Sequence, residues 1–326
     1  MNFVLRVKKN TIMISVIITA KKEPVTVAKA LKSIVRPFYS GIPEDFEIIQ
    51  VSPDEETLES GKETIQNEKW AEKKFLQIKD PDRGKPHALN LAFQKVKGEI
   101  IILTDGDVYF EKNAVAQLLI DFHDPNVGGV TGRPVSQDSK NYMMGYIGHL
   151  LADAAHHKRM INLKKIDSGK SSIFVSKSDF FPMSGYIMAI RNIGLELPND
   201  VLVDDAYLSY IFHNKGMKIA YKPEAIAYVK YPKTVSDYMK QKKRSLGGYI
   251  QLWKYGIVNS SNKSRSFWQE VQYFWFPIFY AKKLKEYFWS CLFYPIRLYT
   301  WIAIWIERKI LHKDFNKTWA RVESTK

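Results

Sequence analysis

The sequence predicts an α/β fold in which a mostly parallel, Rossmann-like central sheet is flanked by helices. Short apolar runs without polar alternation, typical of strands buried on both faces, recur along the first half of the chain. Between them lie segments whose apolar residues recur at helical spacing. Alternation of strands and helices implies right-handed βαβ units, an architecture common in nucleotide-binding proteins. The chain has neither a GxGxxG motif nor a P-loop.

Four apolar runs are the predicted strands of the first half: residues 12–18, 46–51, 75–78 and 100–103. The run at 12–18 is too short to cross a bilayer, and we expect no secretory signal before it. The helices expected between these strands run from Pro24 to Arg36, over 55–73, and onward from Gly84.

The second half continues the alternation less regularly. Helices are predicted at 113–122, at 140–165, from Asp204 onward, and from about Tyr238 to the paired glycines 247–248. Short strands are predicted at 128–132, after a turn within 183–190, and at 218–221 and 225–229.

The most informative stretch is residues 100–107, an apolar run that ends in Asp105, Gly106 and Asp107. Open α/β sheets bind their ligands at the carboxyl ends of such strands. Two carboxylates this close repel each other unless a cation shares their charge. Mg²⁺ often binds through one or two carboxylates plus substrate phosphates. The stretch therefore indicates either a metal–diphosphate site or an ordinary Asp-Gly turn at a strand end.

Two further positions leave the same choice open. Lys85, at a helix start, is placed either to reach a phosphate that the helix N-terminus also binds or to lie exposed in solvent. Asp204 and Asp205, in a first helical turn, either hold a general base beside a pocket or only interact with the helix dipole.

Charge and aromatic residues divide the chain in two. Residues 1–229 hold 30 basic and 28 acidic residues, whereas residues 230–326 hold 19 basic and 6 acidic ones and 7 of the 8 Trp. Basic charge with Trp and Tyr suits an anionic membrane surface, and nucleic acid is the alternative partner. The single Cys291 excludes an internal disulfide framework and a cysteine-based zinc site, and is compatible with a reducing compartment. We predict a catalytic domain over 1–250 and a basic, aromatic helical tail over 251–326.

The tail has one long apolar stretch. From Tyr287 to Ile306 the only charged residue is Arg297, close to Pro295. The stretch is long enough to span a bilayer, but the Pro–Arg interruption and flanking cations fit better with amphipathic helices lying in the membrane interface. The flanking cations are Lys282, Lys283, Lys285, Arg308 and Lys309. We therefore expect peripheral or monotopic membrane attachment.

Seven short motifs, taken in order, resemble those of the family 2 glycosyltransferases, which have the GT-A fold. They are SVIITAKKEP at 15–24, Asp54 after the second strand, GKPHALN at 84–90, TDGD at 104–107, SGYIMAIR at 184–191, VDDAYLSY at 203–210 and QKKRS at 241–245. Several collinear motifs are more specific than any one of them. The last is similar to the Gln-x-x-Arg-Trp signature of processive polysaccharide synthases.

The resemblance implies a role for each matched position. The donor-binding residues would be Ala20, Glu23, Asp54, Lys85 and Asp105, with the nucleoside held by the first three. Asp107 would be the principal ligand of Mg²⁺ or Mn²⁺, with Asp105 beside the ribose and the metal. Asp205 would be the catalytic base. The acceptor and diphosphate side would comprise Ser184, Gly185, Asp204, Gln241 and Arg244.

Two departures from the family pattern bear on function. Asp204 stands where the family has Glu, which shortens that side chain and leaves the base intact. Ser245 stands where Trp is expected, which removes a platform for stacking an acceptor sugar. Together with the lack of multiple transmembrane segments, the second departure argues against processive polymer synthesis.

The function implied is inverting, metal-dependent transfer of a sugar from a nucleotide-sugar donor to a hydroxyl of a lipid-linked or saccharide acceptor. We expect it at an anionic membrane surface on the cytoplasmic face, without nucleic acid. One alternative is a nucleotidyltransferase that makes nucleotide sugars, although TAKKEP at 19–24 is not a Gly-rich pyrophosphate loop. The other is a membrane-binding module without enzymatic activity.

Overall fold

The computed structural model describes residues 12–39, 45–68, 74–164, 173–174, 180–259 and 270–310. Its strands are β1 (Ile14–Thr19), β2 (Phe46–Ser52), β3 (Phe75–Lys79), β4 (Ile100–Asp105), β5 (Tyr109–Phe110), β6 (Val127–Ser136), β7 (Ile173–Phe174), β8 (Met188–Arg191) and β9 (Lys218–Val229). Its helices are α1 (Pro24–Tyr39), α2 (Glu55–Asn67), α3 (Lys85–Phe93), α4 (Ala114–Leu119), the 3-10 helix η2 (Ile120–His123), α5 (Met143–Lys164), α6 (Asp204–Asn214), α7 (Val235–Lys254), α9 (Phe276–Tyr280) and α10 (Leu284–Lys309). The expected N-terminal segment before the first strand and the end of the tail lie outside the described residues.

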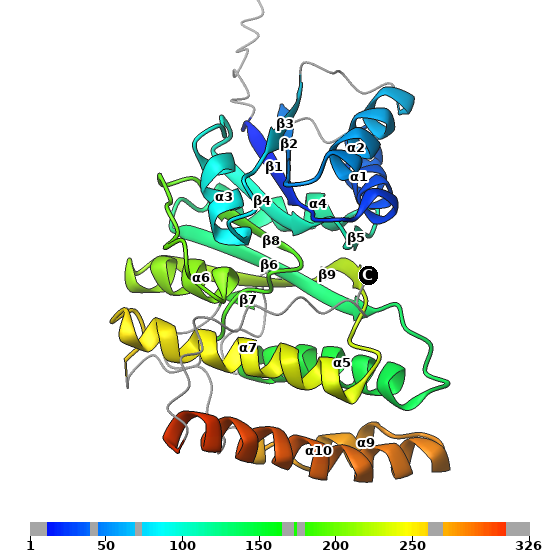
Figure 1. The fold of residues 1–326 in the computed structure, drawn as a ribbon. Coiled ribbons are helices and arrows are strands. Elements are labelled where there is room, and N and C mark those ends of the chain that lie inside the picture. The colour runs from blue at the N-terminus through cyan, green and yellow to red at the C-terminus, as the bar shows by residue number, and fades with distance from the viewer. Residues whose placement is uncertain are drawn as a thin grey trace, which may run out of the picture.

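Within this described part the strands form one nine-stranded sheet, in the order β3-β2-β1-β4-β8-β6-β9-β5, with β7 paired to β9. Helices lie on both faces of the sheet, and α9 and α10 form a further layer beyond α5 and α7 (Figure 1). The predicted α/β fold, a central sheet flanked by helices, is confirmed.

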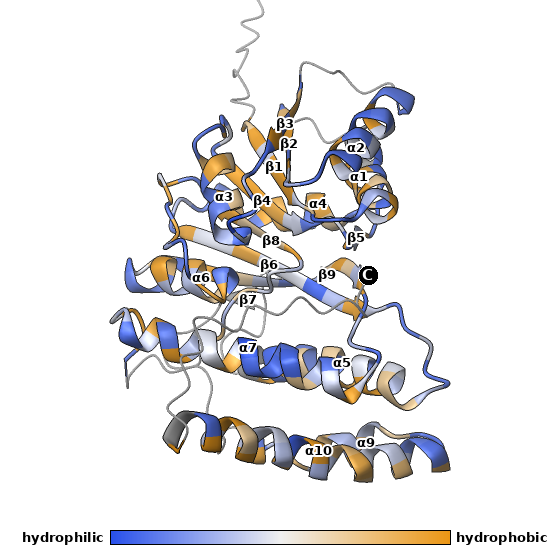
Figure 2. Cartoon of the chain, viewed as in Figure 1, coloured by the Kyte–Doolittle hydropathy of each residue, from blue (hydrophilic) through white to orange (hydrophobic). Residues whose placement is uncertain are grey.

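The first strands are buried on both faces, as their apolar sequences predict. Every residue of β1 and of β2 is buried, and β1 and β4 are among the strongly hydrophobic segments in Figure 2. Ile14 and Ile18 pack with Val27 of α1. Ile17, which points to the opposite face, packs with Leu89 of α3. One layer of helices therefore covers each face of the parallel part of the sheet.

The sheet is parallel among β1 to β4 and again between β6 and β9, whereas its other described pairings are antiparallel. Pairings β3–β2, β2–β1 and β1–β4 are parallel, and so is β6–β9. Strand β8 runs antiparallel to both β4 and β6, and β5 and β7 run antiparallel to β9. An apolar run predicts that a strand is buried but does not indicate its direction, which depends on the long connection through α5.

Several predicted element boundaries are wrong. The helix expected to end at Arg36 continues to Tyr39, and the helix expected over 55–73 ends at Asn67. The strands expected at 218–221 and 225–229 form the single strand β9, because Lys222 is buried rather than part of an exposed turn. Its ammonium lies 3.4 Å from a carboxylate oxygen of the buried Asp121. Helix α7 does not end at the paired glycines but continues to Lys254. A Cβ on Gly248 would lie 2.6 Å from Cγ1 of Val203, so this glycine allows close helix packing rather than ending the helix.

Helix α10 packs against α5 and α7 through a separate small core that includes Tyr238 and Phe293. Two polar contacts join α7 to α10: Arg297 donates to the Tyr238 hydroxyl at 3.2 Å, and Lys243 pairs with Glu307 at 2.7 Å. Within the described ranges, no helix is both long enough and apolar enough to traverse a bilayer.

Candidate functional site

A cavity of about 520 Å³ opens at the carboxyl ends of β1 to β4. Its wall includes the β1–α1 loop, the β3–α3 loop, the end of β4, the start of α6, the end of β9 and one side of α7. The cavity therefore lies at the edge of the sheet where open α/β folds bind their ligands. Of the residues predicted for the site, the cavity wall contains Ala20, Glu23, Lys85, Asp105, Asp107, Asp204, Gln241 and Arg244.

Lys85 is the centre of an ion cluster in this cavity. Its ammonium lies 2.7 Å from Asp105 Oδ1 and 3.3 Å from Asp204 Oδ2, and so joins the end of β4 to the start of α6. The Thr19 hydroxyl also donates to Asp105 Oδ1, at 2.9 Å. Burial opposes the charge of Lys85, but attraction to Asp105 and Asp204 outweighs it and raises the pKa of Lys85. Lys85 therefore stays cationic and compensates two carboxylates.

The turn that carries Asp107 packs tightly against the β1–α1 loop. The Gly106 N–H donates to the Thr19 carbonyl at 2.9 Å. A Cβ on Gly106 would lie 2.5 Å from Ala20 Cβ and 2.7 Å from Glu23 Oε2. Only glycine permits this approach. The tight turn places Asp107 on the cavity wall beside the loop predicted to hold the donor nucleoside.

Asp205, the predicted base, lies beside the cavity but is not part of its wall. Its Oδ2 accepts a hydrogen bond from the Gly185 N–H at 3.1 Å, and its Oδ1 accepts one from the Ala206 N–H at 2.8 Å. The predicted residues Ser184 and Gly185 are likewise set back from the wall, whereas the next residue, Tyr186, lines it. Asp205 is thus held against the turn that brings Tyr186 into the cavity.

Tyr186 shares its electrostatic surroundings with the predicted site. Burial and then the charge of Asp107 raise the pKa of Tyr186 to about 12, with Arg244 acting in the opposite direction and Asp205 adding to the rise. The hydroxyl is therefore protonated at neutral pH. Sequence reasoning placed Tyr186 only in a matched motif and gave it no role.

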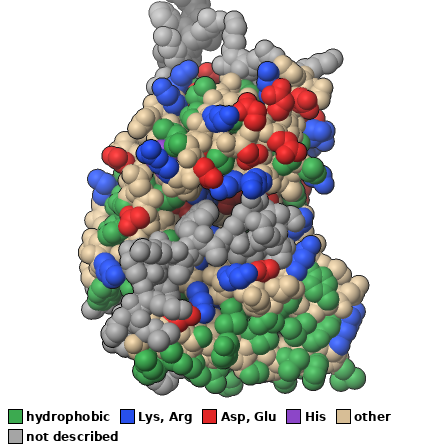
Figure 3. All heavy atoms as spheres, viewed as in Figure 1, with side chains coloured by type: hydrophobic (Ala, Val, Ile, Leu, Met, Phe, Trp, Pro, Cys, Tyr) green, Lys and Arg blue, Asp and Glu red, His purple; other side chains and the backbone are tan. Residues whose placement is uncertain are grey.

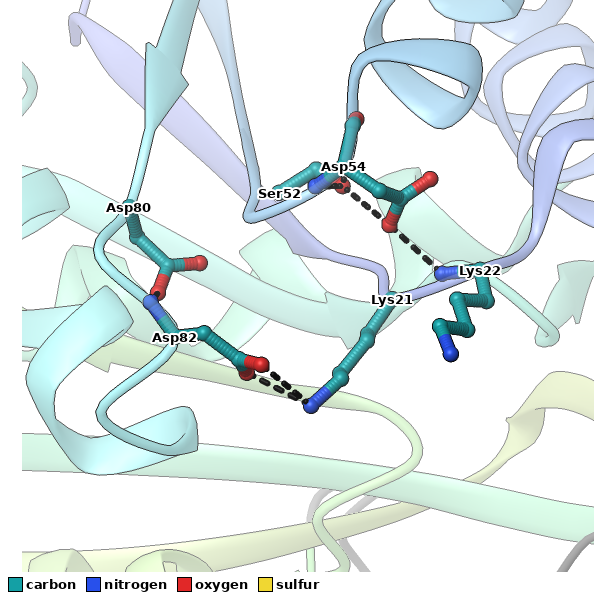
Figure 4. Close-up of polar contacts among 6 residues, drawn as sticks. All are labelled: Lys21, Lys22, Ser52, Asp54, Asp80 and Asp82. Carbon is teal, nitrogen blue, oxygen red and sulfur yellow. Dashed lines mark hydrogen bonds and ion pairs between the residues drawn. The ribbon is translucent and has the colours of Figure 1, made fainter.

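Asp54 is absent from the cavity wall but contacts the β1–α1 loop, which lines it (Figure 4). It is the N-cap of α2 and accepts a hydrogen bond from the Thr57 N–H at 3.0 Å. It also accepts one at 2.6 Å from the N–H of Lys22, a residue with a positive φ of 53°. Burial alone would raise the pKa of Asp54, but these hydrogen bonds keep it low. Asp54 therefore fixes the conformation of the β1–α1 loop.

A second ion pair joins two loops of the cavity (Figure 4). Lys21 of the β1–α1 loop contacts both carboxylate oxygens of Asp82 in the β3–α3 loop, at 2.6 and 2.8 Å. The Asp82 N–H donates in turn to Asp80 Oδ1 at 2.7 Å, and burial raises the pKa of Asp80. Sequence reasoning missed both acids. The signal available was their position directly after β3, at the same sheet edge as Asp105.

Lys230 is another wall residue that sequence reasoning missed. It follows β9 immediately, so it also lies at a strand end. It had no distinguishing signal, because a single lysine after an apolar strand is common. Together with Gln241 and Arg244 of α7 it gives the cavity a wall with two cations.

The acids of the cavity fit a divalent cation that is shared with a substrate. Within the described residues, no group of three or more His, Cys, Asp or Glu side chains is placed to hold a metal ion. Asp105 and Asp107 nevertheless line the same cavity, two residues apart. Mg²⁺ typically takes one or two protein carboxylates together with phosphate oxygens and water. This pair therefore suits an ion that binds with a diphosphate.

Comparison with protein families gives a match over most of the chain. The model of the glycosyltransferase-like family 2 matches residues 11–248. Poly-β-1,6-N-acetyl-D-glucosamine synthase of Staphylococcus epidermidis is 25% identical over 233 residues, which cover 71% of this chain and 49% of the synthase. The synthase of that name from Staphylococcus aureus (strain COL) is 25% identical over 185 residues, covering 55% of this chain and 42% of its own. The chain thus spans about half the length of these curated relatives.

Solved structures share the fold. The mannosyltransferase PcManGT from Pyrobaculum calidifontis, in complex with GDP-Man and Mn²⁺, aligns over 94% of this chain and 89% of its own, with a TM-score of 0.62 and 16% identity. GalNAc-T7 with UDP, GalNAc and Mn²⁺ aligns over 93% of this chain and 57% of its own, with a TM-score of 0.52 and 13% identity. At these identities the likeness establishes the fold.

Proposed function

The chain belongs to the glycosyltransferase-like family 2, and we propose that it transfers a sugar from a nucleotide-sugar donor to an acceptor hydroxyl, inverting the anomeric carbon. The observation that carries this proposal is the composition of the cavity wall. Asp105 and Asp107, two carboxylates suited to a metal, lie in one cavity with Lys85 and Arg244, two cations suited to a diphosphate.

The proposed donor is a nucleoside diphosphate sugar. PcManGT, which shares the fold, holds GDP-Man with Mn²⁺, and GalNAc-T7 holds UDP with Mn²⁺. In this chain the β1–α1 loop with Ala20 and Glu23 would contact the nucleoside, while Asp54 fixes that loop from behind. The Lys21–Asp82 pair would hold the two loops together on either side of it.

Asp107 and Asp105 would hold Mg²⁺ or Mn²⁺ together with the diphosphate. The bound ion would act as a Lewis acid that offsets charge on the departing diphosphate. Lys85, kept cationic by Asp105 and Asp204, and Arg244 of α7 would stabilise the same charge through preorganised contacts.

The proposed reaction is a single displacement. The acceptor oxygen forms a bond to the anomeric carbon as the bond from that carbon to the diphosphate oxygen breaks, and the acceptor proton passes to a carboxylate. We assign this role to Asp205, which the Gly185 N–H holds against the turn that carries Tyr186. Asp204 is the competing candidate because it lines the cavity itself, but its carboxylate is paired with Lys85.

Matched substitutions separate the two candidates. A positioned base contributes ~10²–10⁴-fold to the rate, so Asp205→Asn should lower kcat by about that factor and change the donor KM little. Asp204→Asn should mainly raise the donor KM, because it removes a partner of Lys85. If a folded Asp205→Asn variant kept nearly normal turnover while Asp204→Asn lost kcat, Asp204 would be the base instead.

The activity itself is tested with a panel of nucleotide sugars and divalent metals. Metal-dependent release of a nucleoside diphosphate supports glycosyl transfer. If the protein turned over no nucleotide sugar but released pyrophosphate when given a nucleoside triphosphate together with a sugar phosphate, its activity would be nucleotidyl transfer instead.

For the acceptor we propose a lipid-linked saccharide reached from the cytoplasmic face of a membrane. The support is the surface over α9 and α10, where hydrophobic side chains gather along one edge of the molecule (Figure 3). The apolar face, as we call it, comprises Phe279, Leu284, Phe288, Leu298, Tyr299, Ile302 and Trp305, each at least 46% exposed. Exposed Lys282, Lys283 and Lys285 lie at its start, whereas the side chains of Arg308 and Lys309 lie outside the described set. Aromatic and cationic side chains in this arrangement suit an anionic interface.

Point substitutions test this attachment. Phe288→Glu and Trp305→Glu should each weaken binding of the full chain to phosphatidylglycerol-containing vesicles about tenfold or more, because each removes an apolar contact and adds a repelled charge. Val25→Glu is the matched control, since Val25 is 68% exposed but lies on α1. Equal vesicle binding by all three variants and the unaltered protein would exclude the apolar face as the attachment.

A further inference from the structure

Lys230 is a cation of the cavity wall that the reaction proposed above does not use. It is half-buried and directly follows Val229, the last residue of β9. Its ammonium has no hydrogen bond or ion pair with any other side chain in the portion of the chain that the structure describes. Lys85, in the same cavity, instead has two carboxylate partners. Lys230 is thus a cation of this wall that is available to a ligand.

The backbone fixes Lys230 from both sides. The Val229 carbonyl accepts a hydrogen bond from the Gln137 N–H at 2.9 Å, and the Tyr231 N–H donates to Asp138 Oδ2 at 2.8 Å. Val229 is 1% exposed in the main core, against which Tyr231 also packs. Because successive side chains of an extended segment point to opposite sides, Lys230 is directed away from this core and into the cavity. The backbone hydrogen bonds and the core packing on both sides therefore hold Lys230 at this position.

The neighbours of Lys230 on the wall are suited to an anion. Gln241 and Arg244 of α7 lie three residues apart, so they share one face of the helix, and both line the cavity with Lys230. A desolvated cation is costly unless a partner supplies opposite charge. Lys and Arg ammonium and guanidinium groups bind phosphate oxygens through charge-assisted hydrogen bonds. A phosphate group is the chemistry that this wall would recognise.

We infer that Lys230 is a phosphate-binding residue on the α7 side of the cavity, where it acts together with Arg244. The inference rests on the proposed function and extends it, because it adds a phosphate-binding residue that is separate from the Asp105–Lys85 ion pair. The phosphate belongs either to the departing nucleoside diphosphate or to a phosphorylated lipid acceptor. Both ligands present the same oxygens to an ammonium group.

The first experiment is calorimetric titration of the full chain with inorganic pyrophosphate in the presence of Mg²⁺. Lys230→Met should weaken binding about tenfold, as expected for loss of one hydrogen bond between charged groups. Lys230→Arg should restore most of the affinity. Lys233→Met is the matched control: Lys233 lies three residues further on, is exposed and is absent from the cavity wall. Thermal unfolding of each variant checks that the fold is intact.

A second set of titrations distinguishes the two sources of phosphate. Hexyl phosphate, a short alkyl monoester, is added to protein saturated with uridine or guanosine diphosphate. If it still binds and Lys230→Met weakens it, the residue serves the acceptor. If Lys230→Met instead weakens the nucleoside diphosphate, and that ligand excludes hexyl phosphate, the residue serves the leaving group.

Both results support the inference. It is overturned if Lys230→Met binds pyrophosphate, both nucleoside diphosphates and hexyl phosphate as tightly as Lys233→Met and the unaltered protein do. These measurements need no catalysis. If no nucleotide sugar is turned over but Lys230→Met still loses phosphate affinity, the proposed glycosyl transfer fails while the phosphate-binding role stands.

Discussion

Replacing Lys85 by Met removes the positive charge that joins Asp105 to Asp204. The ammonium lies 2.7 and 3.3 Å from their oxygens, and the three side chains are only 22%, 26% and 17% exposed. At 2.7 Å and an effective dielectric constant of about 20, the attraction to Asp105 alone is ~6 kcal/mol before desolvation is subtracted. Breaking a fully buried pair costs ~3–5 kcal/mol. Because these groups are partly screened, we expect a loss of ~2–3 kcal/mol in the free energy of unfolding.

The raised pKa of Lys85 determines how this loss depends on pH. Because the pKa of Lys85 is raised in the folded protein, its contribution to stability is complete below its unfolded pKa of ~10.4 and is lost only as the pH rises through the raised value. The difference in the free energy of unfolding between Lys85→Met and the unaltered protein should therefore be the same at about pH 6 and about pH 9.

Lys21→Met provides the matched control. Lys21 also lines the cavity and pairs with an aspartate at 2.6 Å, but its side chain and that of Asp82 are 41% and 53% exposed. An exposed pair of this kind contributes less than ~1 kcal/mol. Urea titrations of both variants at about pH 6 and about pH 9 measure the two differences. Equal losses in the two variants, or a Lys85→Met loss that already shrinks between these two pH values, would refute the reasoning.

Three further outcomes are expected. Gly106→Ala should weaken nucleoside diphosphate binding at least tenfold by equilibrium dialysis, because the new Cβ would lie 2.5 Å from that of Ala20 and displace the turn; unchanged affinity would show that the turn adjusts freely. Asp107→Asn should abolish the stimulation of nucleoside diphosphate binding by Mn²⁺, and a stimulation equal to that of the unaltered protein would remove Asp107 from the metal site. Lys243→Glu should lower the free energy of unfolding by ~1 kcal/mol, and adding Glu307→Lys should recover most of it in chemical denaturation, since the pair joins α7 to α10 at 2.7 Å.

The sequence is most informative where burial alone determines structure. Strands β1, β2 and β4 are mainly apolar and almost entirely buried, so composition suffices to place them. The end of β4 then locates Asp105 and Asp107 at the ligand-binding edge of the sheet. Here the local sequence pattern was enough to predict both the strand and the position of these two candidate site residues.

Long-range partners defeat the same reasoning elsewhere. Lys222 looks like a break in a strand until Asp121, about one hundred residues earlier, is known to lie 3.4 Å from it. Gly248 looks like a helix end until Val203 is known to pack against it. In both places a residue that is unfavourable locally is explained by a contact that only the folded chain creates.

The site shows the same division. Lys85 is recognisable at a helix start, but its two carboxylate partners come from separate elements. The resemblance marked Asp205, yet in the fold Asp204 lines the cavity and Asp205 lies against Gly185. Neighbouring residues in a first helical turn point in different directions, and only the packing of α6 determines which one reaches the cavity.

Helix α7 also restricts how this protein can be dissected. One of its sides contributes Gln241 and Arg244 to the cavity. Lys243 and Tyr238 of the same helix bind Glu307 and Arg297 of α10. A shortened chain ending before α10 would lose these contacts with α7 and expose Tyr238, which is otherwise buried. If such a fragment lost turnover, the cause could be displacement of Gln241 and Arg244 from the cavity just as well as loss of a membrane-binding surface. Surface exchanges that keep every helix in place are the cleaner tool.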